Sequence, residues 1–159
     1  MVPISAGVIT VSDRSAAGVR PDQSGPVAVE ALRAAGFACD DATVVPDGAA
    51  AVETALRAAL AQGIRVIVTT GGTGVAPRDQ TPEATLRVIE RTLPGISEEL
   101  RRNGRSETPT ASLTRGLAGV AGRALIVNLA GSPRAVVSGM PVILSVVSHV
   151  LSQLDGGDH

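Results

Sequence analysis

The chain has 159 residues, a formal net charge of −1 and an aromatic content of 1%, and it contains no lysine, so its 14 basic residues are all arginines. Without a lysine amine, the protein has no Schiff-base chemistry, no lysyl-adenylate intermediate and no P-loop lysine for a phosphate. Two histidines and one cysteine exclude an internal disulfide and a structural zinc site of the Cys/His kind within one chain. The length predicts one domain.

The balanced charge and the scarcity of aromatic residues argue against nucleic acid as a partner. Non-specific nucleic-acid binders carry a basic face, and single-strand binders stack bases on aromatic rings, of which Phe37 is the sole example here. The first residues, MVPISAGVITV, contain neither a basic n-region nor an apolar run near the roughly 18 residues that span a membrane. We therefore expect a cytoplasmic protein that binds neither nucleic acid nor a membrane.

Apolar runs of strand length alternate with windows of helical spacing, which is the pattern of an α/β fold. A β-branched run predicts a strand over 7–11, and a Ser-Gly-Pro start predicts a helix over 24–36. Residues 37–45 predict a second strand, which two aspartates interrupt and so favour a sheet edge, and residues 49–62 predict a helix. The nearly continuous run IRVIVTT at 64–70 predicts a central parallel strand that is buried on both faces.

The second half of the chain continues this alternation. A helix is predicted with Thr81 as its cap and with Leu86, Ile89 and Leu93 on its apolar face, followed by a short helix over 96–102. A threonine-proline helix start at Thr108 leads to Leu113 and Leu117. The last predicted elements are a buried strand over 124–129 and a helix over 136–154 with a kink or restart at Pro141. We therefore expect residues 1–154 to form a single domain with one mostly parallel sheet and helices on both faces. Residues 155–159 are expected to form a disordered tail.

Polar or glycine-rich segments follow four of the predicted strands. They are Ser-Asp-Arg at 12–14, Pro-Asp-Gly at 46–48, the glycine-rich segment 71–79 and Gly-Ser-Pro at 131–133. Ligands of open α/β sheets bind beyond the carboxyl ends of the strands, and a parallel topology brings these ends to one edge. Two of the segments are glycine-containing turns that lead toward helix starts, where free N–H groups and the helix dipole favour anions. The first hypothesis is therefore a phosphorylated ligand.

Each of these signals also has a purely structural interpretation. The sequence GGTG at 71–74 also fits a tight exit from a strand, and Ser132 before a proline fits a helix cap. Asp79 lies near a helix start, where an acid complements the dipole, and Asp47 lies in a Pro-Asp-Gly turn that is favoured whatever the function. Two carboxylates beside phosphate-binding turns nevertheless favour a Mg²⁺ site, because this ion binds a few carboxylates together with phosphates and water.

The segment TTGGTGVAPRDQTPEAT, residues 69–85, resembles the signature of the molybdopterin adenylyltransferases of the Mog and MoaB type, which also form domains of gephyrin and of plant Cnx proteins. Further segments resemble the family in the family's own order: 12–14 with 24–26, 45–47, 94–96, 108–111 and 125–133. The resemblance covers the chain to about Leu154. Two positions depart from the family pattern, since Ala130 replaces the usual proline and Arg20 replaces a frequent aromatic residue.

The resemblance implies a three-layer α/β/α domain in a homotrimer. It implies transfer of AMP from ATP to the terminal phosphate of molybdopterin, with release of pyrophosphate and with the product passing to a molybdate-inserting partner of the MoeA type. The two functionally important aspartates of the family fall on Asp47 and Asp79. The residues that the resemblance assigns to substrate binding are Ser12, Asp13, Gly71, Gly72, Thr73, Gly74, Gly131 and Ser132.

The chemistry of this transfer assigns a role to the two aspartates. The attacking group is a phosphate monoester, whose second pKa near 6 leaves it mostly deprotonated at neutral pH, so no general base is needed. We therefore expect Asp47 and Asp79 to hold Mg²⁺ and to orient the triphosphate of the co-substrate ATP. The nearest cations for the phosphates are Arg14, Arg78 and Arg134, whose guanidinium groups bind oxyanions in a bidentate fork.

Three alternatives remain open from the sequence. A catalytically silent MoaB-type paralogue would bind molybdopterin as a carrier or scaffold without adenylylating it. A nucleotide-processing domain like that of competence-damage proteins shares the architecture, although the Thr-Pro-Glu helix start and the late Gly-Ser-Pro turn argue against it. A flavodoxin-like electron carrier is disfavoured because the chain lacks aromatic residues to pack on an isoalloxazine ring.

Overall fold

Seven strands form one mixed sheet in the computed structural model, which describes residues 1–158. The sheet order is β2-β1-β4-β7-β6-β5, and β3 also pairs with β1. β1, β2, β3, β4 and β7 run parallel, whereas β5 and β6 are antiparallel to their neighbours. The strands are β1 Ser5–Val11, β2 Ala38–Cys39, β3 Thr43–Val45, β4 Val66–Thr70, β5 Arg91–Thr92, β6 Ala118–Ala121 and β7 Ala124–Leu129.

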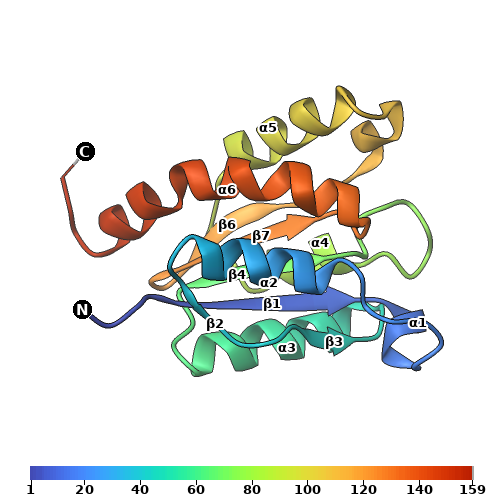
Figure 1. Cartoon of the computed structure of the whole chain (residues 1–159), viewed down its shortest axis with the longest axis horizontal. Helices are drawn as coiled ribbons and strands as arrows, with labels where there is room; N and C mark the ends of the chain where they lie inside the picture. Colours follow the sequence, from blue (N-terminus) through green and yellow to red (C-terminus); the bar gives the residue numbers. More distant parts are fainter. Residues whose placement is uncertain (159) are drawn as a thin grey trace.

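Helices cover both faces of this sheet (Figure 1). α2 and α6 pack on one face, with α5 against α6, and α3 and α4 pack on the other. The helices are α1 Asp13–Ala16, α2 Gly25–Ala34, α3 Ala49–Ala61, α4 Thr81–Leu86, α5 Pro94–Arg105 and α6 Pro133–Leu154, with a 3-10 helix η1 at Pro109–Leu113. The predicted α/β/α fold class with a mostly parallel sheet is therefore confirmed.

The core consists of two apolar layers that the central strands separate. Along β4, Val66 and Val68 face the α2 and α6 layer with Leu32, whereas Ile67 faces the α3 and α4 layer with Leu56. All five residues of β4 are buried, as predicted for a central parallel strand. The alternation follows from the two-residue period of a strand.

Several predicted elements differ from the observed ones. The strand predicted over 37–45 is two short edge strands, β2 and β3, separated at the predicted aspartate interruption. The helix predicted from Thr81 ends at Leu86, whose side chain is 59% exposed. The chain then turns into β5 because Glu90 N and Leu93 N donate to backbone oxygens of β6, at 2.8 and 2.7 Å.

The region between 94 and 133 contains further corrections. α5 spans Pro94–Arg105 instead of 96–102, and the helix expected from Thr108 toward Leu117 is only the short η1. β6 was not predicted, because its sequence AGVA has no strand-like side-chain pattern. Its strand conformation is defined by pairing with β7. The four-residue α1 was not predicted either.

The last helix, α6, starts at Pro133, three residues before its predicted start, and continues through Pro141. It is the one helix within residues 1–158 whose length and apolar composition would allow it to cross a membrane, a test that core helices also pass. Its buried side chains pack on the sheet. The tail predicted over 155–159 includes His159, which lies outside the described residues, whereas Asp155 makes ion pairs with Arg65 and Arg123.

Candidate active site

A pocket of about 920 Å³ opens beyond the carboxyl ends of the parallel strands. The segments that follow β1, β3, β4 and β7 all contribute to its wall, as the parallel topology predicts. The sequence-predicted site residues that line it are Ser12, Asp13, Asp47, Gly71, Gly72, Thr73, Gly74, Asp79, Gly131 and Ser132.

The carbonyl oxygens of the glycine-rich loop 71–74 accept hydrogen bonds from two other residues of the protein. Gly71 O and Gly72 O accept hydrogen bonds from the hydroxyl and the backbone N–H of Thr81, at 2.9 and 3.0 Å. Thr73 O and Gly74 O accept from the backbone N–H and the Nε of Arg115, both at 2.8 Å. Four consecutive carbonyl oxygens are thus satisfied by the protein.

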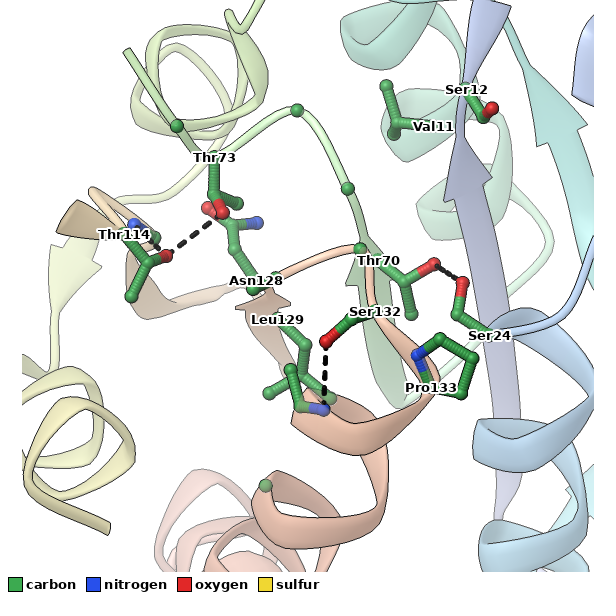
Figure 2. Close-up of a pocket in the computed structure, with 18 of the residues that line it drawn as sticks. Val11, Ser12, Ser24, Thr70, Thr73, Thr114, Asn128, Leu129, Ser132 and Pro133 are labelled. Atoms are coloured by element: carbon green, nitrogen blue, oxygen red, sulfur yellow. Dashed lines mark hydrogen bonds between the residues drawn. The ribbon is translucent and has the colours of Figure 1, made fainter. Parts of the chain in front are cut away.

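Unlike these carbonyl oxygens, three backbone N–H groups of the same loop have no partner in the described part of the chain. Those of Gly72, Thr73 and Gly74 have no acceptor within the described residues, although all three residues line the pocket. Figure 2 shows the loop running from Thr70 past Thr73, whose hydroxyl accepts from Thr114 Oγ1 at 2.9 Å. Successive unpaired backbone N–H groups form a concave site for an anion. With its unpaired N–H groups, the loop can accept an anionic group such as a phosphate.

Close packing explains why glycines begin this loop. Gly71 has a φ of +94°, and a Cβ atom there would lie 2.2 Å from Val11 O at the end of β1. Gly72 has a φ of +68°, and its Cβ atom would lie 2.2 Å from Thr81 Oγ1. The tight-exit interpretation is thus correct for both residues, and both of them also line the pocket.

Asp13 and Asp47 join the ends of β1 and β3 through two reciprocal hydrogen bonds. Asp13 N donates to Asp47 Oδ2 at 2.9 Å, and Asp47 N donates to Asp13 Oδ1 at 3.1 Å. Arg78 donates two hydrogen bonds to the Asp13 carboxylate, at 2.7 and 2.9 Å, and one to Asp47 O at 2.8 Å. Arg78, expected to bind phosphate, instead pairs with Asp13 and fixes the loop that carries Asp47.

Asp79 closes the far end of the glycine-rich segment. Its Oδ2 accepts from Ala76 N at 3.1 Å, and its N–H donates to Ala76 O at 3.0 Å. The helix that follows has Gln80 as its N-cap, one residue before the expected cap Thr81, because the Thr81 hydroxyl bonds to Gly71 O instead. This turn places Asp79 on the pocket wall.

Asp47 and Asp79 fit the demands of a magnesium ion that arrives with a nucleotide. Each carboxylate uses one oxygen to accept a backbone N–H, and the second oxygen has no hydrogen-bond partner among residues 1–158. The described part of the chain contains no cluster of three or more metal-binding side chains. Mg²⁺ does not require one, because phosphate oxygens and water complete its shell.

Two serines on the pocket wall cap helices. Ser132 Oγ accepts from Ala135 N at 3.1 Å at the start of α6, and Ser12 Oγ accepts from Ser15 N at 3.2 Å. The cap interpretation of Ser132 is thus correct (Figure 2). Because α6 has 22 residues and begins at the pocket, its first-turn N–H groups add positive potential there.

Three arginines on the pocket wall are free to bind a ligand. Arg14, Arg20 and Arg134 make neither an ion pair nor a side-chain hydrogen bond within the described residues. Arg20 appeared in the sequence only as a departure from the family pattern. Arg115 was missed altogether, because its partner Gly74 lies 41 residues away and no local spacing indicates such a contact.

Most of the remaining wall of the pocket comes from residues 20–24 and from α5, η1 and α6, and was not predicted. Beside the charged Arg101 and Glu107, its helical part contains small and apolar residues, among them Leu100, Gly104, Ala111, Leu113 and Gly139. No aromatic side chain lines the described pocket. A heterocyclic ring bound here therefore rests on aliphatic side chains and main chain.

The pairing of Asp13 with Arg78 predicts how the free energy of unfolding changes at acidic pH. The hydrogen bonds from Arg78 lower the pKa of the Asp13 carboxyl below its ordinary value of 3.8, with a further contribution from the Asp47 N–H. Because the folded-state pKa is depressed, the stabilisation is present above that ordinary value and is lost as the pH falls through the folded-state pKa. NMR titration of the carboxyl carbon should show a higher Asp13 pKa in Arg78→Gln than in the wild type.

The matched control is Arg102→Gln, which removes a surface arginine that pairs with Glu99 instead. This variant should leave the Asp13 titration at its wild-type position. An Asp13 pKa that does not change in Arg78→Gln would contradict the assigned pairing.

The chain is similar in sequence and in fold to several known proteins. Residues 7–149 match the family described as a probable molybdopterin binding domain. A molybdopterin adenylyltransferase of Haemophilus influenzae is 38% identical over 84% of this chain and 69% of its own. The structure of a molybdopterin biosynthesis Mog protein from Mycobacterium ulcerans superposes with a TM-score of 0.91 at 42% identity, covering 98% of this chain and 99% of that one.

A molybdenum cofactor biosynthesis bifunctional protein of Synechococcus elongatus is 42% identical over 98% of this chain. The chain spans about half the length of this relative, 49%. The family match covers most of the chain, and the similarity to the solved Mycobacterium ulcerans structure extends over nearly all of it. The chain therefore belongs to the Mog and MoaB family of molybdopterin-binding domains, whose members act in molybdenum cofactor biosynthesis.

Proposed function

We propose that this protein is a molybdopterin adenylyltransferase, which transfers AMP from ATP to the terminal phosphate of molybdopterin and releases pyrophosphate. The observation that carries the proposal is the loop 71–74, with its carbonyl oxygens bonded to the protein and three unpaired N–H groups at the pocket. The Haemophilus influenzae relative, a molybdopterin adenylyltransferase, supports the same reaction.

The reaction needs few protein groups. An oxygen of the molybdopterin phosphate attacks the α-phosphorus of ATP, the bond from that phosphorus to the oxygen bridging to the β-phosphorus breaks, and pyrophosphate leaves with the bond's electron pair. The attacking phosphate is already ionised at neutral pH, so no protein base and no protein nucleophile take part. The chain's task is to bind and align two polyanions and to stabilise the charge that moves onto the leaving group.

Each pocket group has a part in this task. The unpaired N–H groups of 72–74 hold phosphate oxygens, and Arg14, Arg20 and Arg134 supply positive charge that no carboxylate of the described chain neutralises. Asp47 and Asp79 present free carboxylate oxygens to Mg²⁺, which when bound supplies charge neutralisation for the triphosphate. This division requires no lysine.

The resemblance and the relatives also support proposals about assembly. We take the protein to act as a homotrimer that passes adenylylated molybdopterin to a MoeA-type partner. The bifunctional relative, of which a chain like this one forms about half, supports a direct transfer between neighbouring activities.

Pyrophosphate release tests the proposed function. The purified protein mixed with molybdopterin and Mg-ATP should release pyrophosphate in proportion to the molybdopterin consumed, and excess EDTA should abolish the release. Binding of molybdopterin without any release would instead identify the catalytically silent carrier. Release at full rate in excess EDTA would contradict the magnesium role of the two aspartates.

Asp79→Asn tests the role of one carboxylate. The amide oxygen of asparagine still accepts the Ala76 N–H, so the turn and the fold should persist. The loss of the negative charge weakens the metal site, and AMP transfer should fall by about 10²-fold or more while molybdopterin binding stays near the wild-type value. Pyrophosphate release and calorimetric binding measure the two effects, and wild-type turnover in this variant would overturn the role of Asp79.

A further inference from the structure

Arg115 joins three parts of the site without lining the pocket. It lies between η1 and β6, and its half-buried side chain faces the back of the glycine-rich segment. Its Nε donates to Gly74 O at 2.8 Å and its Nη2 donates to Asp79 O at 2.6 Å. Its Nη1 pairs with the Glu83 carboxylate in α4. The planar guanidinium thus holds both ends of segment 74–79.

These contacts act on the two groups that the proposed reaction uses. The Nε bond holds the carbonyl of Gly74 at the end of the glycine-rich loop, next to Thr73 O, which accepts from the backbone N–H of Arg115 itself. The bond to Asp79 O fixes the backbone of the residue whose carboxylate is offered to the metal. Between these points the segment is exposed, with Val75 73% accessible, so few apolar contacts hold it.

The form of the arginine side chain matters for this arrangement. A guanidinium presents donors in a rigid planar fork, whereas a lysine ammonium is a single point charge on a flexible stem. One ammonium group cannot replace donors that reach Gly74 O, Asp79 O and Glu83 in one plane. The contacts are also charge-assisted, which strengthens each of them.

We propose that Arg115 is a positioning residue for adenylyl transfer, which positions the end of the glycine-rich loop and the Asp79 carboxylate by holding the carbonyl oxygens of Gly74 and Asp79. This inference rests on the proposed function for its kinetic consequences. It concerns a residue that does not touch substrate, metal or reacting atoms.

The experiment compares Arg115→Ala and Arg115→Lys with the wild type, at a temperature well below the melting temperature of each protein. We expect kcat for pyrophosphate release to fall by about 10²-fold in Arg115→Ala, since misplacement of catalytic groups by about 1 Å has this scale of effect. Arg115→Lys should remain closer to Arg115→Ala than to the wild type. Millimolar guanidinium should restore part of the Arg115→Ala rate.

Two matched variants separate positioning from general stabilisation. Glu83→Gln removes the ion pair but leaves both carbonyl contacts of Arg115, so its kcat should stay close to that of the wild type. Arg87→Lys changes a surface arginine outside the pocket and should behave likewise. A kcat in Glu83→Gln as low as in Arg115→Ala would overturn the proposal, because the ion pair would then be the interaction that matters.

ATP affinity makes the result independent of turnover. Calorimetry should show weaker ATP binding in Arg115→Ala, by about tenfold, because the end of the glycine-rich loop and the Asp79 carboxylate are no longer held in place. If the wild type releases no pyrophosphate, the proposed function fails, and the ATP affinities alone decide the role of Arg115. If the wild type is active and Arg115→Ala matches it in both kcat and affinity, the role of Arg115 is wrong and the proposed function stands.

Discussion

The site depends on one constraint, which is that the carbonyl oxygens of residues 71–74 all accept hydrogen bonds from the protein. Thr81 from α4 and Arg115, which lies between η1 and β6, supply these bonds. With the carbonyls held, the N–H groups of the loop are left to the pocket, where an anion is the natural partner. The close approach of Gly71 to the end of β1 makes this backbone conformation a property of the sheet itself.

The arginines divide into two groups around this loop. Arg78 and Arg115 are bonded to carboxylates and carbonyls, and they shape the segments that carry Asp47 and Asp79. Arg14, Arg20 and Arg134 have no such partners within the described chain and supply charge for ligands. In a protein without lysine, arginine thus has both roles: some arginines stabilise the backbone of the site, and others offer positive charge to the ligand. The contacts of each guanidinium decide which role it has.

The sequence allowed much of this arrangement to be predicted where local patterns dominate. Residues 64–70 and 124–129 were recognisable as buried strands, and the rule that ligands lie beyond parallel strand ends brought Asp47, Asp79 and the glycine-rich loop to one edge. β5 and β6 were missed because strands of two and four residues carry little side-chain pattern of their own and are defined by pairing with β6 and β7. The contacts of Arg78 and Arg115 were missed because each joins residues more than 30 positions apart.

Amide chemical shifts of the ¹⁵N-labelled protein during titration with Mg-ATP test the central claim most directly. The account predicts that the N–H signals of Gly72, Thr73 and Gly74 show the largest changes in the chain, because their acceptors arrive with the ligand. The N–H of Gly63, which already donates to Leu60 O at 3.0 Å outside the pocket, should stay in place. Changes at 72–74 no larger than at Gly63, with saturable shifts elsewhere, would contradict the account.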